Sequence, residues 1–78
     1  MKKSEFITIL ADAIEVDASL LNENTVFADL DDYDSMAVMS IIAMSDEHFS
    51  KKFTGEQLKS MKSVKNLMDM IGNENFTE

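Results

Sequence analysis

A cluster of aspartates divides the sequence and restricts what it can fold into. Asp29, Asp31, Asp32 and Asp34 fall within six residues, and a strongly apolar run follows over residues 35–49. Aspartate is a poor former of helix interiors, whereas its side chain bonds readily to the backbone of turns and helix N-termini. The cluster therefore predicts a loop, and the apolar run predicts a helix that begins where the loop ends.

The first helix is predicted over residues 4–15, because apolar side chains recur there every three or four positions, as on one helix face. Ser4 is its expected N-cap. Residues 16–34 then form a long connection, in which asparagines and aspartates prevent a regular helix. The connection holds apolar residues that are too many for a free linker: Val16, Leu20, Leu21, Val26, Phe27 and Leu30.

The second helix is predicted over residues 35–49, with Asp34 as its N-cap. Apolar residues cover more than half of its circumference, which indicates either deep burial or an apolar face that partners touch. We expect its inner stripe to consist of Met36, Met39, Ile42 and Ala43, broadened by Val38, Ile41 and Met44.

Two further helices are predicted after it. Thr54 and Gln57 have the spacing of a capping box, which predicts a short helix from residue 55 to about 61. Ser63 should cap a last helix, and Gly72 should stop it. The inward residues of this last helix are expected to be Val64, Leu67, Met68 and Ile71.

These elements predict an all-α fold, a small four-helix bundle. It would have three main helices, one short helix, and a long loop between the first and second helices. A length of 78 residues suits a single domain over residues 1–78 with a modest core. We expect the mostly polar residues 73–78 to fray.

The charge of the chain restricts its partners. A net charge of −8 argues against binding to nucleic acid, whose phosphates would repel the chain. It favours protein partners with basic surfaces. Eleven of the acids lie in residues 1–50, whereas five of the lysines lie in residues 51–78, so the acidic surface belongs to the first part of the chain.

Composition also restricts the compartment. The chain has no cysteine, which excludes disulfides and thiolate metal sites and fits a reducing environment. Its apolar runs are too short to span a membrane, and its N-terminus lacks the unbroken apolar stretch of a signal peptide. We therefore expect a cytoplasmic monomer without membrane insertion.

Ser35 stands at the predicted start of the second helix, where free backbone N–H groups and the helix dipole favour a phosphate ester. A nucleophilic serine would need a base within hydrogen-bond reach. The single histidine, His48, lies thirteen residues further along the same helix. At roughly 1.5 Å per residue, the separation is about 20 Å. Ser35 is therefore interpreted as a residue that another enzyme modifies, and neither a catalytic residue nor a metal site is predicted.

The triplet Asp34-Ser35-Met36 resembles the Asp-Ser-Leu motif of acyl carrier proteins. The resemblance extends over most of the chain, since the order of helix, long loop, motif, short helix and last helix is similar. It also includes residues outside the motif, namely Phe27, Leu30, Asp46, Glu47, Phe49, Ser63 and Val64.

The resemblance implies that Ser35 carries 4′-phosphopantetheine, transferred from coenzyme A by a separate Mg²⁺-dependent phosphopantetheinyl transferase. The thiol of this arm would hold acyl groups as thioesters for fatty acid, polyketide or related secondary biosynthesis. Asp34 and Met36 are expected to flank the attachment point. Acyl-loading and acyl-processing enzymes with basic surfaces would dock at Asp29, Asp31, Asp32, Ala37, Ser40 and Met44. Candidate residues for sheltering an acyl chain are Phe27, Met39, Ile42, Phe53, Leu58, Met61 and Met68, for which ordinary core filling is the alternative.

Two features depart from the pattern of the family. Members usually have acids two and five residues after the serine, where this chain has Ala37 and Ser40. The loop before the motif is also one residue longer than the common Leu-Gly-x-Asp-Ser form and has no glycine. Acidic charge has thus moved from the helix face into the loop, which favours a specialised carrier over the housekeeping fatty-acid carrier.

Other functions stay open from the residues alone. A small acidic helical inhibitor, such as an immunity protein or a DNA mimic, would use its acids as the binding surface. Ser35 would then be only a helix cap. A calcium loop needs glycine at position six and glutamate at position twelve, but counting from Asp29 gives Asp34 and Ser40. A peptidyl carrier usually has a Gly-Gly-x-Ser motif, whereas aspartate before the serine indicates the acyl class.

Tyr33, just before the motif, has two interpretations. Its ring would either pack over the loop and the first helix or stay exposed and touch the arm or a partner. We favour packing, because an amphipathic ring suits a half-buried position.

Overall fold

The computed structural model describes residues 1–30 and 33–77 and contains four α-helices. They are α1 (Lys3–Ala13), α2 (Ser35–Phe49), α3 (Gly55–Lys59) and α4 (Val64–Ile71). Three short 3₁₀ turns accompany them: η1 (Ala18–Leu20), η2 (Phe27–Asp29) and η3 (Asn73–Asn75). Within the described ranges no strand forms, and the predicted small all-α bundle with a long loop after its first helix is confirmed.

Side-chain caps set the starts of the last three helices. The Asp34 carboxylate accepts a hydrogen bond from the first turn of α2, and this predicted N-cap is confirmed. Thr54 and Ser63 each form the capping box that their spacing predicts, at the starts of α3 and α4. Such caps satisfy backbone N–H groups that have no partner inside the helix. The short helix α3 ends at Lys59, before the expected residue 61.

The boundaries of α1 differ from the prediction. The N-cap position is taken by Lys2, not by Ser4, and the helix ends at Ala13. Glu15 adopts a left-handed conformation, with φ of 59°, which an α-helix cannot continue through. The backbone geometry of a single residue, which periodicity does not reveal, thus shortens the helix.

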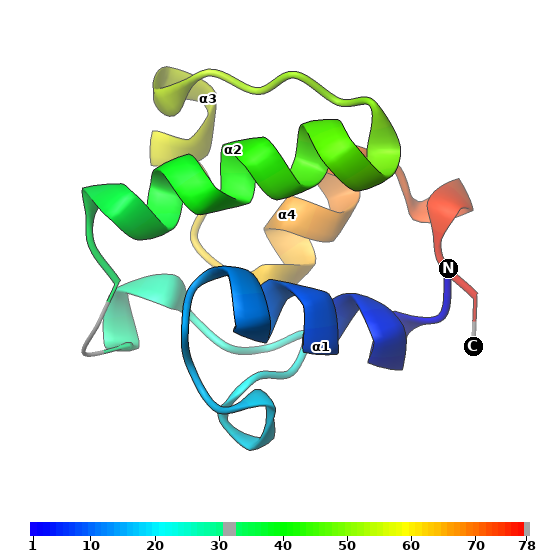
Figure 1. Ribbon diagram of the computed structural model, residues 1–78, viewed down its shortest axis with the longest axis horizontal. Coiled ribbons are helices and arrows are strands. Elements are labelled where there is room, and N and C mark those ends of the chain that lie inside the picture. Colours follow the sequence, from blue (N-terminus) through cyan, green and yellow to red (C-terminus); the bar gives the residue numbers. More distant parts are fainter. Residues whose placement is uncertain (31–32, 78) are drawn as a thin grey trace.

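Figure 1 shows α2 running across the molecule with α1 below it and α4 behind. The short α3 lies above the first half of α2 in this view. The two termini lie close together at the right, near the other end of α2. No helix in the described part of the chain is both long and apolar enough to cross a membrane.

The core lies between α1, α2 and α4. From α1, Phe6 and Leu10 are fully buried, and from α2 so is Ile41. The last helix contributes the four inward residues that its periodicity predicts: Val64, Leu67, Met68 and Ile71. Burying side chains of this size stabilises the fold by about 1.5–3 kcal/mol each.

The predicted inner face of α2 is wrong in part: Ile41 and Met44 are buried as expected, and Val38 and Ile42 are partly buried against the core. Met36 and Met39 are 73% and 67% exposed, and Ala43 is also exposed. The buried residues of α2 are Ala37, Ile41, Met44 and Ser45, of which Ala37 and Ser45 were not expected to face inward. Both rows have helical spacing, and α2 is apolar around most of its circumference, so the pattern alone does not fix its rotation. Packing against the other helices selects the second row.

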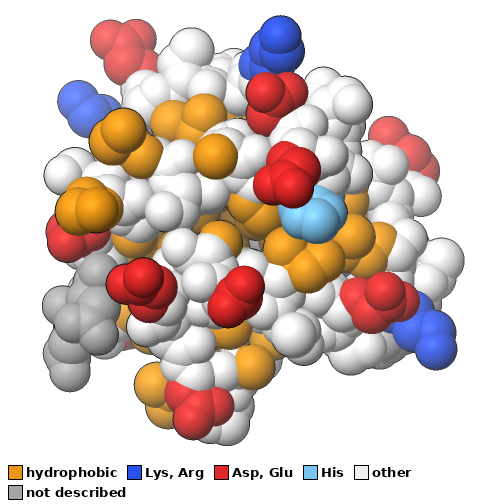
Figure 2. All heavy atoms as spheres, in the orientation of Figure 1, with side chains coloured by type: hydrophobic (Ala, Val, Ile, Leu, Met, Phe, Trp, Pro, Cys, Tyr) orange, Lys and Arg blue, Asp and Glu red, His pale blue; other side chains and the backbone are white. Residues whose placement is uncertain are grey.

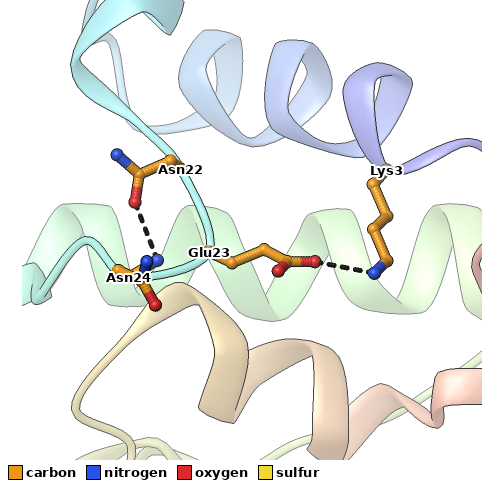
Figure 3. A network of polar contacts seen from close by, with 4 residues as sticks. All are labelled: Lys3, Asn22, Glu23 and Asn24. Carbon is orange, nitrogen blue, oxygen red and sulfur yellow. Dashed lines mark hydrogen bonds and ion pairs between the residues drawn. The ribbon is translucent and has the colours of Figure 1, made fainter. Parts of the chain in front are cut away.

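The long loop is held by the segment that precedes α4. Phe27 N–H donates to the Lys62 carbonyl at 2.9 Å, and Val64 N–H donates to the Thr25 carbonyl at 3.0 Å. Figure 3 shows the loop turning at Asn22–Asn24, where Asn22 Oδ1 accepts from Asn24 N–H at 2.8 Å. These bonds fix Phe27 in a buried position and make the loop an ordered part of the fold.

One ion pair links the same loop to α1. Lys3 Nζ lies 2.9 Å from Glu23 Oε1, and Figure 3 shows the two side chains reaching toward each other. Both groups are partly exposed, so the pair contributes at most about 1 kcal/mol. The backbone bonds, not this pair, therefore determine the position of the loop.

The expectation that the C-terminal residues fray is wrong for residues 73–77; Glu78 lies outside the described residues. The Phe76 ring lies 4.9 Å from that of Phe6 and 5.5 Å from that of Phe49, measured between centroids. Thr77 N–H donates to the Met1 carbonyl at 2.9 Å. A single aromatic side chain in a polar tail thus anchors it to the core.

Candidate functional site

Ser35 is the first residue of α2, and its side chain is exposed. The residue before it, Asp34, has extended backbone angles and accepts the Ala37 N–H at Oδ1 over 3.0 Å. The chain therefore turns sharply from the loop into the helix and leaves the hydroxyl at the surface. The N-terminal N–H groups of a helix favour a negative charge beside them, so this position suits a phosphate ester.

An apolar groove of about 690 Å³ begins at Ser35 and lies between α2, η2 and α3. Four of its lining residues follow one row along α2, at helical spacing from the serine: Ser35, Val38, Met39 and Ile42. Phe27 from η2 and Leu58 from α3 lie across from them and are buried. An exposed hydroxyl is thus placed at one edge of a groove that suits an aliphatic chain.

Tyr33 forms part of the same groove. Its ring stacks on that of Phe27, with a centroid distance of 5.1 Å and an interplanar angle of 28°. The ring therefore packs on the loop, as the first of its two interpretations expects. Burial raises the pKa of the Tyr33 hydroxyl above its usual value.

The histidine offers Ser35 no base. His48 is exposed near the other end of the continuous helix α2. With a rise of roughly 1.5 Å per residue, the two side chains are about 20 Å apart. His48 therefore cannot act as a base for the Ser35 hydroxyl.

A family model described as a phosphopantetheine attachment site matches residues 4–71, from the first turn of α1 to the end of α4. The chain belongs to this family. Neither a curated protein nor a solved structure gives a significant match to it.

Domains of this family are carriers rather than catalysts, and the chain is one of these phosphopantetheine-binding domains. Its prosthetic group is covalently attached 4′-phosphopantetheine. Domains of this family interact in general with a phosphopantetheinyl transferase and with acyl-processing enzymes. The structure fits such a group, because an exposed hydroxyl at a helix N-terminus adjoins an apolar groove.

The carrier domain brings most of the predicted acyl-sheltering residues together. Five of the seven candidates line the groove: Phe27, Met39, Ile42, Leu58 and Met61. The other two lie elsewhere, since Met68 is buried in the core on α4 and Phe53 is half-buried in the connection before α3. Met39 is both exposed and part of the groove, so it lies at the rim.

Several groove residues were not predicted from the sequence: Val26, Ala28, Tyr33, Val38, Gly55, Lys59 and Lys62. Val38 could have been found, because it shares the helical row of Ser35. The residues from η2 and α3 could not, since their approach to α2 depends on bonds between distant parts of the chain.

The predicted docking residues divide into three groups. Asp29 is exposed and Ser40 is partly exposed, so both can touch a partner. Ala37 and Met44 are buried against the core, and their assignment to a docking surface is wrong. Their row is the one that packing turns inward. The remaining two, Asp31 and Asp32, lie outside the described residues.

The accessible surface beside Ser35 is apolar as well as acidic. Met36 and Met39 are exposed next to Ser35, on the helix that begins there. Figure 2 shows hydrophobic side chains at the surface over the first half of α2, with acidic side chains around them. Partners of the carrier domain therefore meet a mixed surface at this end of α2.

Proposed function

We propose that Ser35 is the attachment residue for 4′-phosphopantetheine, with Asp34 and Met36 on either side of it. The observation that carries this proposal is the position of the hydroxyl, exposed at the start of α2 and at the edge of the apolar groove. It also falls inside the residues that the family model matches. No other described serine is the first residue of an α-helix, and no other described serine lines this groove.

In the transfer reaction, Ser35 Oγ would form a bond to the pantetheine-bearing phosphorus of coenzyme A. The pyrophosphate bond breaks, and adenosine 3′,5′-bisphosphate leaves with the electron pair. The hydroxyl proton goes to a base of the transferase, since His48 lies about 20 Å from Ser35 along α2. The N-terminal N–H groups of α2 then stabilise the phosphodiester charge. When bound, the group supplies a thiol that holds acyl chains as thioesters.

We further propose that the domain serves a dedicated biosynthetic pathway of fatty acid, polyketide or related type. Support comes from the two positions where the family usually has acids, since Ala37 is buried and Ser40 is uncharged. Exposed Met36 and Met39 lie beside them on α2. Enzymes that dock here would combine apolar contact at α2 with basic groups that face acids such as Asp29.

The attachment is tested by mass. The protein is incubated with coenzyme A, Mg²⁺ and several promiscuous phosphopantetheinyl transferases, then weighed intact. We expect the mass of one phosphopantetheine to be added to the wild type and to Ser60→Ala, an exposed serine that does not line the groove. Ser35→Ala should gain nothing. A gain that survives Ser35→Ala, or no gain with any transferase, would contradict the proposal.

A further inference from the structure

The apolar groove beside Ser35 has an unusual electrostatic character for this protein. Its polar lining side chains are the hydroxyl groups of Tyr33 and Ser35 and the ammonium groups of Lys59 and Lys62. Among the described residues, no carboxylate lines it. The chain as a whole has 15 acids against 7 lysines. A groove whose charged lining residues, among those described, are both lysines therefore differs in charge from the molecule as a whole.

The two lysines of the groove have exposed side chains. Lys59 lies at the end of α3 and Lys62 in the turn before α4. The ion pair seen in the described part of the chain joins Lys3 to Glu23, away from the groove. Lysine stems cover apolar surface while their ammonium groups stay in water. The groove thus has an apolar interior and a rim with two lysines that form no ion pair among the described residues.

This combination matches one class of cargo. Aliphatic carbons suit the apolar interior, and a terminal anion suits the rim, where it keeps part of its hydration. We propose that the groove receives arm-borne acyl chains that end in a carboxylate, the half-thioesters of dicarboxylic acids, with the carboxylate held at Lys59 and Lys62. This inference rests on the proposed attachment at Ser35, because the arm would deliver the chain to the groove from there.

The phosphodiester of the arm is a second source of negative charge that the same lysines would attract. The two sources differ in what they require. A carboxylate acts only when a charged cargo is loaded, whereas the phosphodiester is present in the holo form with no cargo. The test therefore compares cargo of equal length with and without the carboxylate, and includes apo and holo proteins.

Octanoyl and suberyl groups are loaded from their coenzyme A thioesters, and thioester cleavage by hydroxylamine is followed by intact mass. Each rate is divided by that of the matching free acyl-pantetheine, which removes the intrinsic reactivity. Exposed ion pairs typically contribute 0.2–1 kcal/mol, so we expect cleavage of the suberyl form to be slowed about 1.4- to 5-fold more than that of the octanoyl form.

The lysine variants decide the cause. The extra protection should disappear in Lys59→Met/Lys62→Met and weaken at high salt. It should persist in Lys51→Met/Lys65→Met, which removes two exposed lysines that do not line the groove. Equal protection of both cargoes, or protection that survives in the first double variant, would overturn the inference.

Two further outcomes are distinguished by the same samples. If the groove variant changes the melting temperature of the holo protein relative to apo while the cargoes remain alike, the lysines serve the arm phosphate and the inference fails. If no mass is added at Ser35, the proposed function fails and the inference fails with it. Mass addition without cargo discrimination overturns the inference alone.

Discussion

At the scale of single residues, Asp34 determines how Ser35 is presented. Its carboxylate accepts the Ala37 N–H at 3.0 Å and so fixes the first turn of α2. Removing an N-cap of this type costs about 1 kcal/mol, within a range of roughly 0.5–2. We expect Asp34→Ala to lower the free energy of unfolding in urea by that amount. Asp34→Asn, which keeps an acceptor oxygen, should stay close to the wild type, and an equal loss in both variants would contradict a capping role.

Tyr33 provides a spectroscopic probe of the groove, since the chain has a single tyrosine and no tryptophan. Burial raises the pKa of its hydroxyl in the folded protein. Ultraviolet titration should therefore give a midpoint above the usual value of about 10 in the native protein and near that value in urea. Because the folded state favours the neutral phenol, its stabilising contribution is complete below the unfolded pKa. It is lost as the pH rises through the folded pKa. Coincident native and denatured titrations would argue against a half-buried ring.

Ser45 is buried in α2, and its Oγ has no hydrogen-bond partner among the described residues. Burying an unpaired hydroxyl costs roughly 1–3 kcal/mol. We expect Ser45→Ala to raise the free energy of unfolding by about 1 kcal/mol. Ser40→Ala, on the partly exposed side of the same helix, gains only the difference in helix propensity, about 0.5 kcal/mol or less. A gain no larger at Ser45 than at Ser40 would show that the hydroxyl finds a partner in solution.

At the scale of secondary structure, the two glycines have opposite roles. Gly72 ends α4 with φ of 116°, a conformation that other residues rarely adopt. Gly55 begins α3, and an added Cβ there would meet no atom within 4 Å. We expect Gly72→Ala to lower the free energy of unfolding by about 1 kcal/mol or more and Gly55→Ala to raise it by about 0.5–1 kcal/mol. Calorimetry of the two variants should therefore show shifts of opposite sign, and shifts of the same sign would contradict this assignment.

The elements also differ in how far the sequence predicts them. Caps act between residues three apart, so Asp34, Thr54 and Ser63 could be identified without the fold. The rotation of α2 could not, because its two apolar rows have the same spacing. The packing of α1 and α4 against α2 buries one row, and Met36 and Met39 of the other row remain accessible.

At the scale of the whole molecule, the dominant feature is a net charge of −8 on 78 residues. Like charges on a small domain repel one another in the compact state, and salt screens that repulsion. We expect added NaCl or millimolar Mg²⁺ or Ca²⁺ to raise the melting temperature. Sucrose at matched osmolality serves as an uncharged control. A melting temperature that salt and divalent ions leave unchanged would contradict this expectation.

The sequence by itself determined the helices, most of their caps and the exposed serine at the start of α2. These features depend on contacts within one or two helical turns, and such contacts form between residues that are close together in the sequence. It also indicated part of the groove, namely Ser35 and five of the seven residues that were expected to shelter an acyl chain.

Only the tertiary structure decided which row of α2 is buried, how Phe76 anchors the tail, and that Lys59 and Lys62 face the groove near Ser35. Each of these depends on residues far apart in the chain that meet through packing and backbone bonds between the loop and the segment before α4. Where several apolar faces have the same periodicity, local pattern leaves the choice open. The face that becomes buried is selected by the free energy gained when it packs against the rest of the core.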